Sequence, residues 1–341
     1  MPTTSPFALS SELISELLSG LRLYGVRYQR IQTGNTFGLN FAGRPGHAYL
    51  HYVAVGEVVL HTANGGTLPL SAGEAVFLPH GEEHQLLSAT ATDVLDIDNI
   101  ETAPLDEKVS GIDTCPSTQE TPGAVLFFGC MKIDLGSMQR LADVMPEIMR
   151  ADANGTRWPG LMHTLDAMKR EICSGRVGYA GILARLADVV GAMFIRGWVE
   201  EGCGNSPGLA AALRDPRLAQ AILAIHREPG RDWSVAELAA KSHISRSAFA
   251  ERFQTTIGIP PLRYATEVKM HLAVRWLTSE KITIDIASQR LGYASQAAFS
   301  RAFKRVTGKS PGAIRMLDRP FGYHHRFKVV FHPAEGISGW G

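Results

Sequence analysis

An internal repeat constrains the fold of this 341-residue chain more than any other feature. The segment SRSAFAERFQTTIGIPP, residues 245–261, aligns with SQAAFSRAFKRVTGKSP, residues 295–311, at a fixed offset of fifty. A fixed period of this kind is the signature of one supersecondary unit used twice. The coinciding pairs are Ser245/Ser295, Ala248/Ala298, Phe249/Phe299, Phe253/Phe303, Gly258/Gly308 and Pro261/Pro311.

Each copy predicts a helix, a tight turn and a second helix. The first helices are SVAELAAK (234–241) and TIDIASQRL (283–291), and the turns SHIS and GYAS follow them. Ser245 and Ser295 are expected to cap the second helices, because a side-chain oxygen at that position accepts free amides of a helix start. The phenylalanines at i and i+4 fall on one face and anchor the second helix to the first. The unit is therefore a helix–turn–helix that occurs twice.

Side chains between the phenylalanines point outward and carry groups that suit DNA. Gln and Arg make bidentate hydrogen bonds with adenine and guanine edges in the major groove, while Lys and Arg neutralise phosphates. The helix expected over 261–279 is roughly 28 Å long at 1.5 Å per residue, comparable with the roughly 34 Å between successive major-groove faces. We therefore predict binding to double-stranded DNA. The outward residues are Arg246, Ser247, Ala250 and Glu251, then Gln296, Ala297, Ser300, Arg301 and Lys304, with phosphate contacts from Lys304, Arg305 and Lys309.

Charge is distributed unevenly along the chain. Residues 231–315 carry fourteen Lys and Arg against six Asp and Glu, a net charge of +8, which leaves 20 basic and 27 acidic residues elsewhere. A basic module attached to an acidic remainder indicates a polyanionic partner for that module alone. Together with the repeat, this disfavours the alternative in which these charges are the solvated face of a plain helical bundle.

Here the sequence resembles the DNA-binding domain of the AraC/XylS family of bacterial transcription regulators. The resemblance covers about residues 225–316, and GYASQAAFSRAFKRVTGKSPGAIR is its most specific part. In that family each helix–turn–helix offers its second helix to one major-groove segment. Glu251 departs from the family, because many members have a basic residue there. Carried over, the base readers would be Ser247, Ala250 and Glu251, then Gln296, Ala297, Ser300 and Arg301.

The first third of the chain has the pattern of an all-β domain. Residues 24–100 contain short β-branched and aromatic runs broken by Gly, Pro, Asn and Asp, which favours a sandwich or barrel. The run G-E-x-x-x-x-P-x-G-x-x-H from Gly73 to His84 resembles the second motif of cupin barrels. In catalytic cupins this histidine joins two histidines and a glutamate of an earlier strand on a metal. The corresponding candidates here, His47, His51 and Glu57, occur in an order that does not fit, so we expect no enzyme.

Three soft-ligand side chains of the predicted barrel form a candidate metal site. His51 and His84 lie in strands that we expect side by side, and Cys130 in LFFGCMKI adds a thiol. Two His and one Cys suit Zn²⁺ or copper. The alternative is that both histidines are hydrogen-bonded core residues. We interpret the i, i+4 spacing of His80 and His84 as accidental, because the proline and glycine beside His80 predict a turn.

From about residue 136 the apolar residues recur three and four apart, which predicts helices. The run MQRLADVMPEIM (138–149) is expected to be the first of them. The run YAGILARLADVVGAMFIRGWV (179–199) is apolar nearly all round, so it is either a core helix or a helix facing a partner. If it forms a homodimer, we expect Leu186 and Val190 in the interface. The Gly/Ser/Pro-rich run at 200–216 predicts a linker.

The spacing of the cysteines and the hydropathy of the chain indicate the cellular compartment. No C-x-x-C pair occurs, so neither a disulfide framework nor a cysteine zinc knuckle is indicated. No run of eighteen apolar residues and no secretory signal is present, which predicts a cytoplasmic protein without a membrane partner. We interpret the four cysteines as reduced thiols that pack as small hydrophobic residues, with a redox sensor as the alternative; they are Cys115, Cys130, Cys173 and Cys203.

These observations predict an α+β two-domain fold. It comprises a cupin-like β-barrel sensor domain over 8–200, with a helical dimerisation segment over 136–200, a linker over 201–216, an all-α double helix–turn–helix over 217–316 and a tail over 317–341. The predicted function is a sequence-specific transcription regulator with a small-molecule, metal or redox effector and RNA polymerase as a further partner. The alternatives are a metal-dependent cupin enzyme, such as a dioxygenase or isomerase, fused to a DNA-targeting module, and a sequence-indifferent nucleoid protein.

Overall fold

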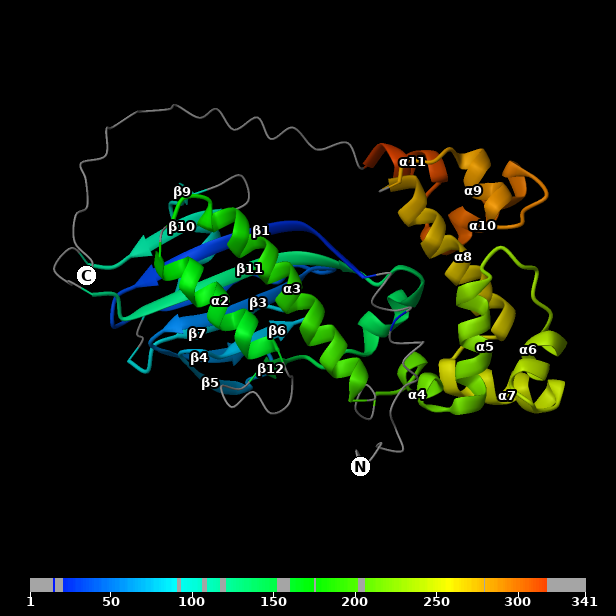
Figure 1. Ribbon diagram of the computed structural model, residues 1–341, viewed down its shortest axis with the longest axis horizontal. Helices are drawn as coiled ribbons and strands as arrows, with labels where there is room; N and C mark the ends of the chain where they lie inside the picture. Colours follow the sequence, from blue (N-terminus) through cyan, green and yellow to red (C-terminus); the bar gives the residue numbers. More distant parts are fainter. Residues whose placement is uncertain are drawn as a thin grey trace.

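A computed structural model describes residues 15, 21–90, 93–105, 109–116, 121–151, 160–174, 176–201, 206–278 and 280–317. It contains a two-sheet β domain joined to a bundle of short helices (Figure 1). The predicted tail from residue 318 onward, Cys203 and the side chain of Cys173 lie outside the described residues. No helix in the described ranges is long and apolar enough to cross a membrane.

Two sheets form the β domain. The first has the strand order β12-β6-β3-β11-β1-β10-β9 and the second has the order β5-β4-β7-β2-β8. The strands are β1 (Arg22–Thr33), β2 (Gly38–Phe41), β3 (Ala48–Val55), β4 (Glu57–Thr62), β5 (Thr67–Ser71), β6 (Ala75–Leu78), β7 (His84–Leu87), β8 (Leu95–Asp96), β9 (Ala103–Pro104), β10 (Val109–Thr114), β11 (Ala124–Asp134) and β12 (Met149–Ala151), with a 3₁₀ turn η1 (Ile97–Asn99) after β8.

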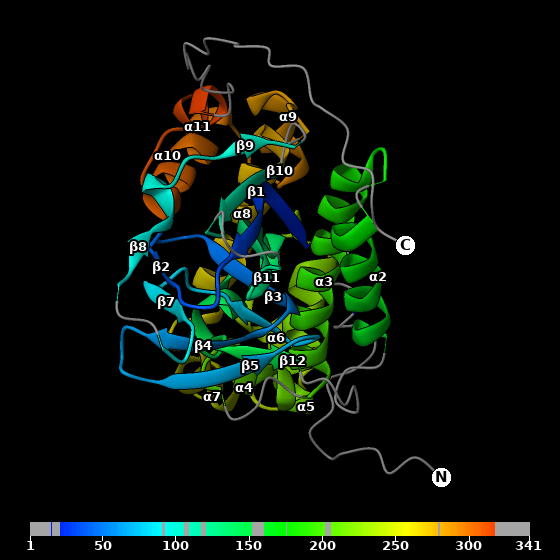
Figure 2. The ribbon, with the colours of Figure 1, turned by 90° about the vertical axis from the view of Figure 1, so that its left-hand side faces the viewer.

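The alternation of side chains along the strands gives the first sheet two buried faces. In β3, Tyr49 and Val53 face the second sheet, in one apolar cluster. Leu50 and Tyr52 face the other way, in a cluster with two helices, α2 (Leu161–Ser174) and α3 (Tyr179–Glu200). Figure 2 shows these helices together on one side of the sheets. The predicted all-β domain followed by helices is confirmed.

The run MQRLADVMPEIM is not the α-helix that we predicted. It forms a 3₁₀ segment η2 (Gly136–Val144), followed by β12. Met145 is extended, with φ −64° and ψ 148°. Because the ring of Pro146 disfavours helical backbone in the preceding residue, the helix cannot continue across Met145.

The remaining helices form the C-terminal bundle. Helix α8 joins two similar groups of helices, one on each side of it (Figure 1). The predicted linker contains the short helix α4, which is largely buried and shares the core of α2 and α3. The elements are α4 (Leu209–Arg214), α5 (Pro216–Arg227), α6 (Val235–Lys241), α7 (Arg246–Ile257), α8 (Pro261–Thr278), α9 (Ile284–Arg290), α10 (Gln296–Thr307) and α11 (Pro311–Leu317).

Candidate nucleic-acid interface and sensor core

The two second helices of the repeat, α7 and α10, begin and end at equivalent positions. Ser245 Oγ accepts the N–H of Ala248 at 3.3 Å, and Ser295 Oγ accepts the N–H of Ala298 at 3.2 Å. The glycines that follow α7 and α10 are left-handed, with φ 87° and 74°. The predicted caps are confirmed, and both units are helix–turn–helix structures.

Buried phenylalanines decide which face of each helix is presented to solvent. The ring centroids of Phe249 and Phe253 are 5.5 Å apart, and those of Phe299 and Phe303 are also 5.5 Å apart. All four side chains have 0% exposure. Most of the predicted outward residues are exposed and two are half-buried, namely Ala250 and Ser300; the exposed ones are Arg246, Ser247, Glu251, Gln296, Ala297, Arg301, Lys304, Arg305 and Lys309.

The two outward faces differ in charge. The face of α10 carries Arg301, Lys304 and Arg305, whereas that of α7 combines Arg246 with Glu251. A further cation of α7, Arg252, forms an ion pair with Asp215, the residue that caps α5. Sequence reasoning did not single out Arg252, because its partner is 37 residues away. The second copy is therefore the more electropositive of the two.

In the β domain, His51 and His84 meet across the sandwich. Their Nε2 atoms are 2.7 Å apart, and each side chain is 1% exposed. The strands are not side by side as we predicted, since β3 belongs to one sheet and β7 to the other. The two rings lie among aromatic side chains; Phe41 stacks on His84 with centroids 5.0 Å apart. The predicted pairing is thus present, but face to face between the sheets.

The hydrogen bonds of the pair define its tautomers. His84 Nδ1 lies 2.8 Å from the carbonyl oxygen of Glu82, so Nδ1 donates its proton there and Nε2 accepts. His51 must then donate from Nε2, which leaves its buried Nδ1 without a hydrogen-bond partner among the described residues. Burial lowers the pKa of His84 to about 4, and burial together with repulsion from His84 lowers the pKa of His51 well below its ordinary value. Both rings are therefore neutral at pH 7.

Cys130 does not join the two histidines. Among the described residues, no group of three or more His, Cys, Asp or Glu side chains is placed to hold a metal ion. Cys130 is 3% exposed, and burial raises the pKa of its thiol, which disfavours the thiolate that a metal needs. Two nitrogens on one tetrahedral zinc lie roughly 3.3 Å apart, given Zn–N bonds of about 2.0–2.1 Å. The observed 2.7 Å is a hydrogen bond, and the pair would have to open to bind an ion.

Other residues of the cupin-like motif have structural roles. Glu74 is buried, accepts the N–H of Ser71 at 2.9 Å and pairs with Arg150 at 2.7 Å. A Cβ on Gly81 would lie 2.4 Å from the carbonyl oxygen of Arg44, so only glycine fits there. His80 contacts the carbonyl oxygen of Met145 rather than His84, in line with our interpretation of that spacing.

An ion pair links the β domain to the helix between the two repeats. Arg140 of η2 contacts Glu267 of α8 at 2.7 Å, and Arg263 contacts the same carboxylate at 3.2 Å. A cleft of about 910 Å³ beside this pair is bounded by η2, α8 and the end of α10, and Arg305 lies on its wall. Nothing in the sequence predicted this contact, because the ion pair joins residues 127 positions apart.

Comparison with known proteins agrees with this architecture. The family described as Cupin matches residues 12–200, and the family described as Helix-turn-helix domain matches residues 238–316. A putative AraC-like transcription regulator of Streptomyces lividans is 32% identical over 218 residues, which cover 63% of this chain and 72% of that protein. This chain belongs to the AraC-like transcription regulators.

One further relative and one solved structure are also similar to this chain. The HTH-type transcriptional regulator AlkR of Acinetobacter baylyi is 24% identical over 308 residues, covering 89% of this chain and 99% of that protein. The crystal structure of ToxT from Vibrio cholerae O395 matches 89% of this chain and 99% of that chain, with 10% identity and a TM-score of 0.32. As an AraC-like regulator, the chain combines a cupin-like domain with a DNA-binding helix–turn–helix domain.

Proposed function

We propose that this AraC-like protein reads a two-part operator, with α10 as the main reader and α7 as the weaker one. One observation carries the proposal: α7 and α10 are equivalent helices whose outward faces are exposed, yet only α10 adds Gln296 and Arg301 to a cationic surface. Arg301 suits guanine and Gln296 suits adenine. Glu251 would repel phosphates and could accept only from the amino groups of cytosine or adenine, which limits guanine reading by α7.

Replacing Arg301 with alanine should weaken operator binding by about 1–3 kcal/mol, because the contact with one base pair is lost. Lys309→Ala is the matched control, because it removes an exposed cation just beyond α10 and should weaken binding to operator and random DNA alike. Fluorescence anisotropy on both DNAs at several salt concentrations measures the difference. An equal loss on operator and random DNA for Arg301→Ala would remove Arg301 from the base readers.

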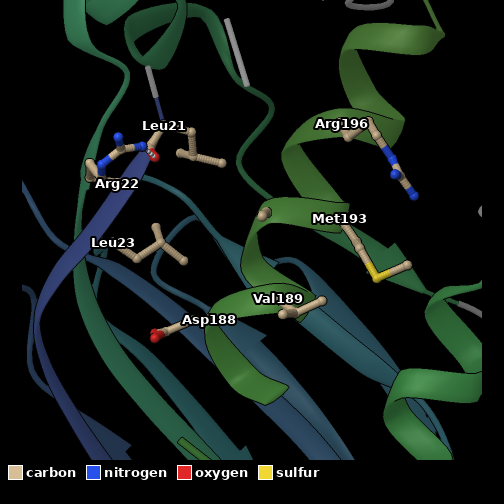
Figure 3. A pocket seen from close by; sticks show the side chains of 8 residues that line it. Leu21, Arg22, Leu23, Asp188, Val189, Met193 and Arg196 are labelled. Atoms are coloured by element: carbon tan, nitrogen blue, oxygen red, sulfur yellow. Dashed lines mark hydrogen bonds between the residues drawn. The ribbon is translucent and has the colours of Figure 1, made fainter. Parts of the chain in front are cut away.

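We propose a homodimer formed by the outward face of α3. Val190 is fully buried in the core and Leu186 is half-buried, so the interface that we predicted from the sequence is wrong at Val190. The exposed apolar side chains are Ile182 and Val189, at 49% and 48% exposure. Val189 also lines a groove of about 480 Å³ between α3 and the start of β1 (Figure 3). These two residues lie seven positions apart, on the same face of α3.

The double substitution Ile182→Asp with Val189→Asp should convert a dimer to a monomer. Burying each side chain is worth roughly 1.5–3 kcal/mol, so the dimer Kd should rise at least about a hundredfold. Sedimentation velocity at several protein concentrations measures the Kd. Val190→Asp is the contrasting variant, which should unfold the domain instead. A wild-type chain that sediments as a monomer at micromolar concentration would contradict the proposal.

We propose that signals reach the DNA reader through η2. A small molecule, metal or oxidant that favours one arrangement of the β domain would shift the arrangement of α8 through the contact of Arg140 with Glu267. His51 and His84 are the candidate site for Zn²⁺ or copper, since an ion could lie between their Nε2 atoms once the pair opens and the Nε2 proton of His51 moves to Nδ1. Metal analysis of protein purified without a metal column, in wild type and His84→Ala, tests this; equal, negligible metal in both would leave the pair as core.

Two other functions are less well supported. A metal-dependent cupin enzyme needs three or more ligands, whereas His51 and His84 meet as a hydrogen-bonded pair; a turnover assay with added metal separates this possibility. A sequence-indifferent nucleoid protein would not need Gln and Arg on the outward face of α10. Such a protein would bind operator and random DNA with equal affinity, whereas a specific regulator would prefer the operator. We expect the regulator to act in the cytoplasm, with contact to RNA polymerase as a further prediction.

A further inference from the structure

The two helix–turn–helix units touch through their backbones beside the middle of α8. Gly230 lies in the loop between α5 and α6, and Gly292 lies in the turn between α9 and α10. A Cβ on Gly292 would lie 2.2 Å from the carbonyl oxygen of Gly230. A Cβ on Gly230 would lie 2.4 Å from the carbonyl oxygen of Arg290. Loop and turn are therefore closer together than any side chain at either position would permit.

The repeat shows that this contact, rather than the backbone conformation alone, requires glycine at 292. Gly292 follows the C-cap of α9 with φ 76°, and the residue that follows the C-cap of α6 is His243 with φ 53°. The first copy thus tolerates a full side chain in the left-handed conformation, although non-glycine residues adopt it uncommonly. The turn at Gly292 is one residue longer than the turn at His243, and it has the carbonyl of Gly230 against it.

Side chains around the contact reinforce it. Lys269 of α8 lies over the ring of Tyr293, the residue after Gly292, with Nζ 5.7 Å from the ring centroid. Three elements converge here: the loop before α6, the helix α8 and the turn before α10.

The loop itself is held to the first unit. Arg231 pairs with Glu228 at 3.1 Å and with Glu237 of α6 at 2.8 Å, and its guanidinium lies 4.2 Å from the ring centroid of Trp233. Glu237 also completes a capping box with Ser234 at the start of α6. A displacement of this loop would therefore carry α6 and, with it, the first reading helix.

We infer that the contact of Gly230 with Gly292 fixes the orientation of α7 relative to α10 and thereby sets the half-site spacing that the protein accepts. The inference rests on the proposed two-part operator. Two modules bind together strongly only when their geometry matches the two sites, because the second binding step is then intramolecular. Helix α8 joins the two units covalently, and the contact of Gly230 with Gly292 is a second link between them, which limits their rotation about α8.

The test compares Gly292→Ala and Gly230→Ala with Gly258→Ala. Gly258 follows α7 with φ 87°, and a Cβ there would have no atom of the described residues within 4 Å apart from its chain neighbours, so its substitution brings left-handed strain without a clash. Gly230→Ala disturbs the same contact as Gly292→Ala, at a residue where φ is not in the left-handed range. The Kd is measured on the selected operator, on operators with a spacer one base pair longer or shorter, and on each half-site alone.

Gly292→Ala and Gly230→Ala should each lose about tenfold or more in affinity for the native spacing, while single half-site Kd values stay within about twofold of wild type. Gly258→Ala should keep the wild-type ratio of the Kd values on operators with the native and the altered spacer. The inference would be overturned if both contact variants kept the wild-type ratio of Kd values on the native and altered spacings. It would also be overturned if they lost equal affinity for the half-sites and for the operator. Failure of the wild-type chain to select two half-sites would instead contradict the proposed function itself.

Discussion

Replacing Phe299 with alanine is expected to destabilise the second helix–turn–helix by about 3–5 kcal/mol and to abolish operator binding. The ring is fully buried against Phe303 and Tyr293, with centroids 5.5 and 5.6 Å away. It belongs to a small apolar cluster of α8, α9, α10 and α11 that is separate from the main core. A core of this size has little stability to lose, so α10 should no longer be held in place.

Hydrogen exchange measured by mass spectrometry should locate this effect. Amides of α9 and α10 should exchange much faster in Phe299→Ala, whereas those of α5 to α7 should keep their protection. Phe249→Ala is the matched variant, because Phe249 occupies the same position of the repeat but belongs to the core shared with α2 and α3. It should lower the free energy of unfolding of the whole chain. Uniform loss of protection in Phe299→Ala would show that the two units are not separate in stability.

Acidification should destabilise the protein strongly between about pH 6.5 and pH 4. Burial lowers the pKa of His84 from 6.5 to about 4 and that of His226 to about 3. The unfolded chain takes up protons near pH 6.5 while the folded chain does not, so the stability present above that pH is lost as pH falls. Each of these two histidines should cost about 2 kcal/mol by about pH 5. His51 acts in the same direction.

Urea unfolding at about pH 7.5 and about pH 5 measures this loss. In His226→Gln the difference between the two conditions should shrink by about 2 kcal/mol. His226 is suited to the test because it lies in α5, outside the β domain that contains the His51–His84 pair, and its Nε2 is 2.7 Å from the Tyr264 hydroxyl oxygen. A free energy of unfolding that is the same at both pH values would show that these rings titrate normally in the folded protein.

The repeat made the DNA-binding half predictable from sequence. Serine caps, paired phenylalanines and terminal glycines are local signals, so the bounds of α7 and α10 follow from residues within a few positions of each end. The outward faces follow from the same pairs, because burial of two residues four apart fixes the rotation of a helix.

The sensor half was less predictable, because its key contacts depend on which sheet each strand joins. His51 and His84 were expected as neighbours within a sheet, yet strand periodicity shows only which face a side chain takes, not the partner strand. Val190 could not be told from Val189 by hydropathy, since α3 is apolar nearly all round; only packing on the first sheet separates the buried residue from the exposed one. The glycine contact at 230 and 292 joins residues of two units and has no local signature.

Selection of binding sites from random DNA by the wild-type protein tests the central proposal most directly. We expect an enriched sequence with two half-sites about one helical turn apart, roughly 10–10.5 base pairs between centres. The half-site under α10 should be the more constrained, and the constraint at one of its base pairs should disappear in Arg301→Ala. An enriched pool without a shared sequence, or with the stronger constraint under α7, would contradict the proposal that α10 is the main reader.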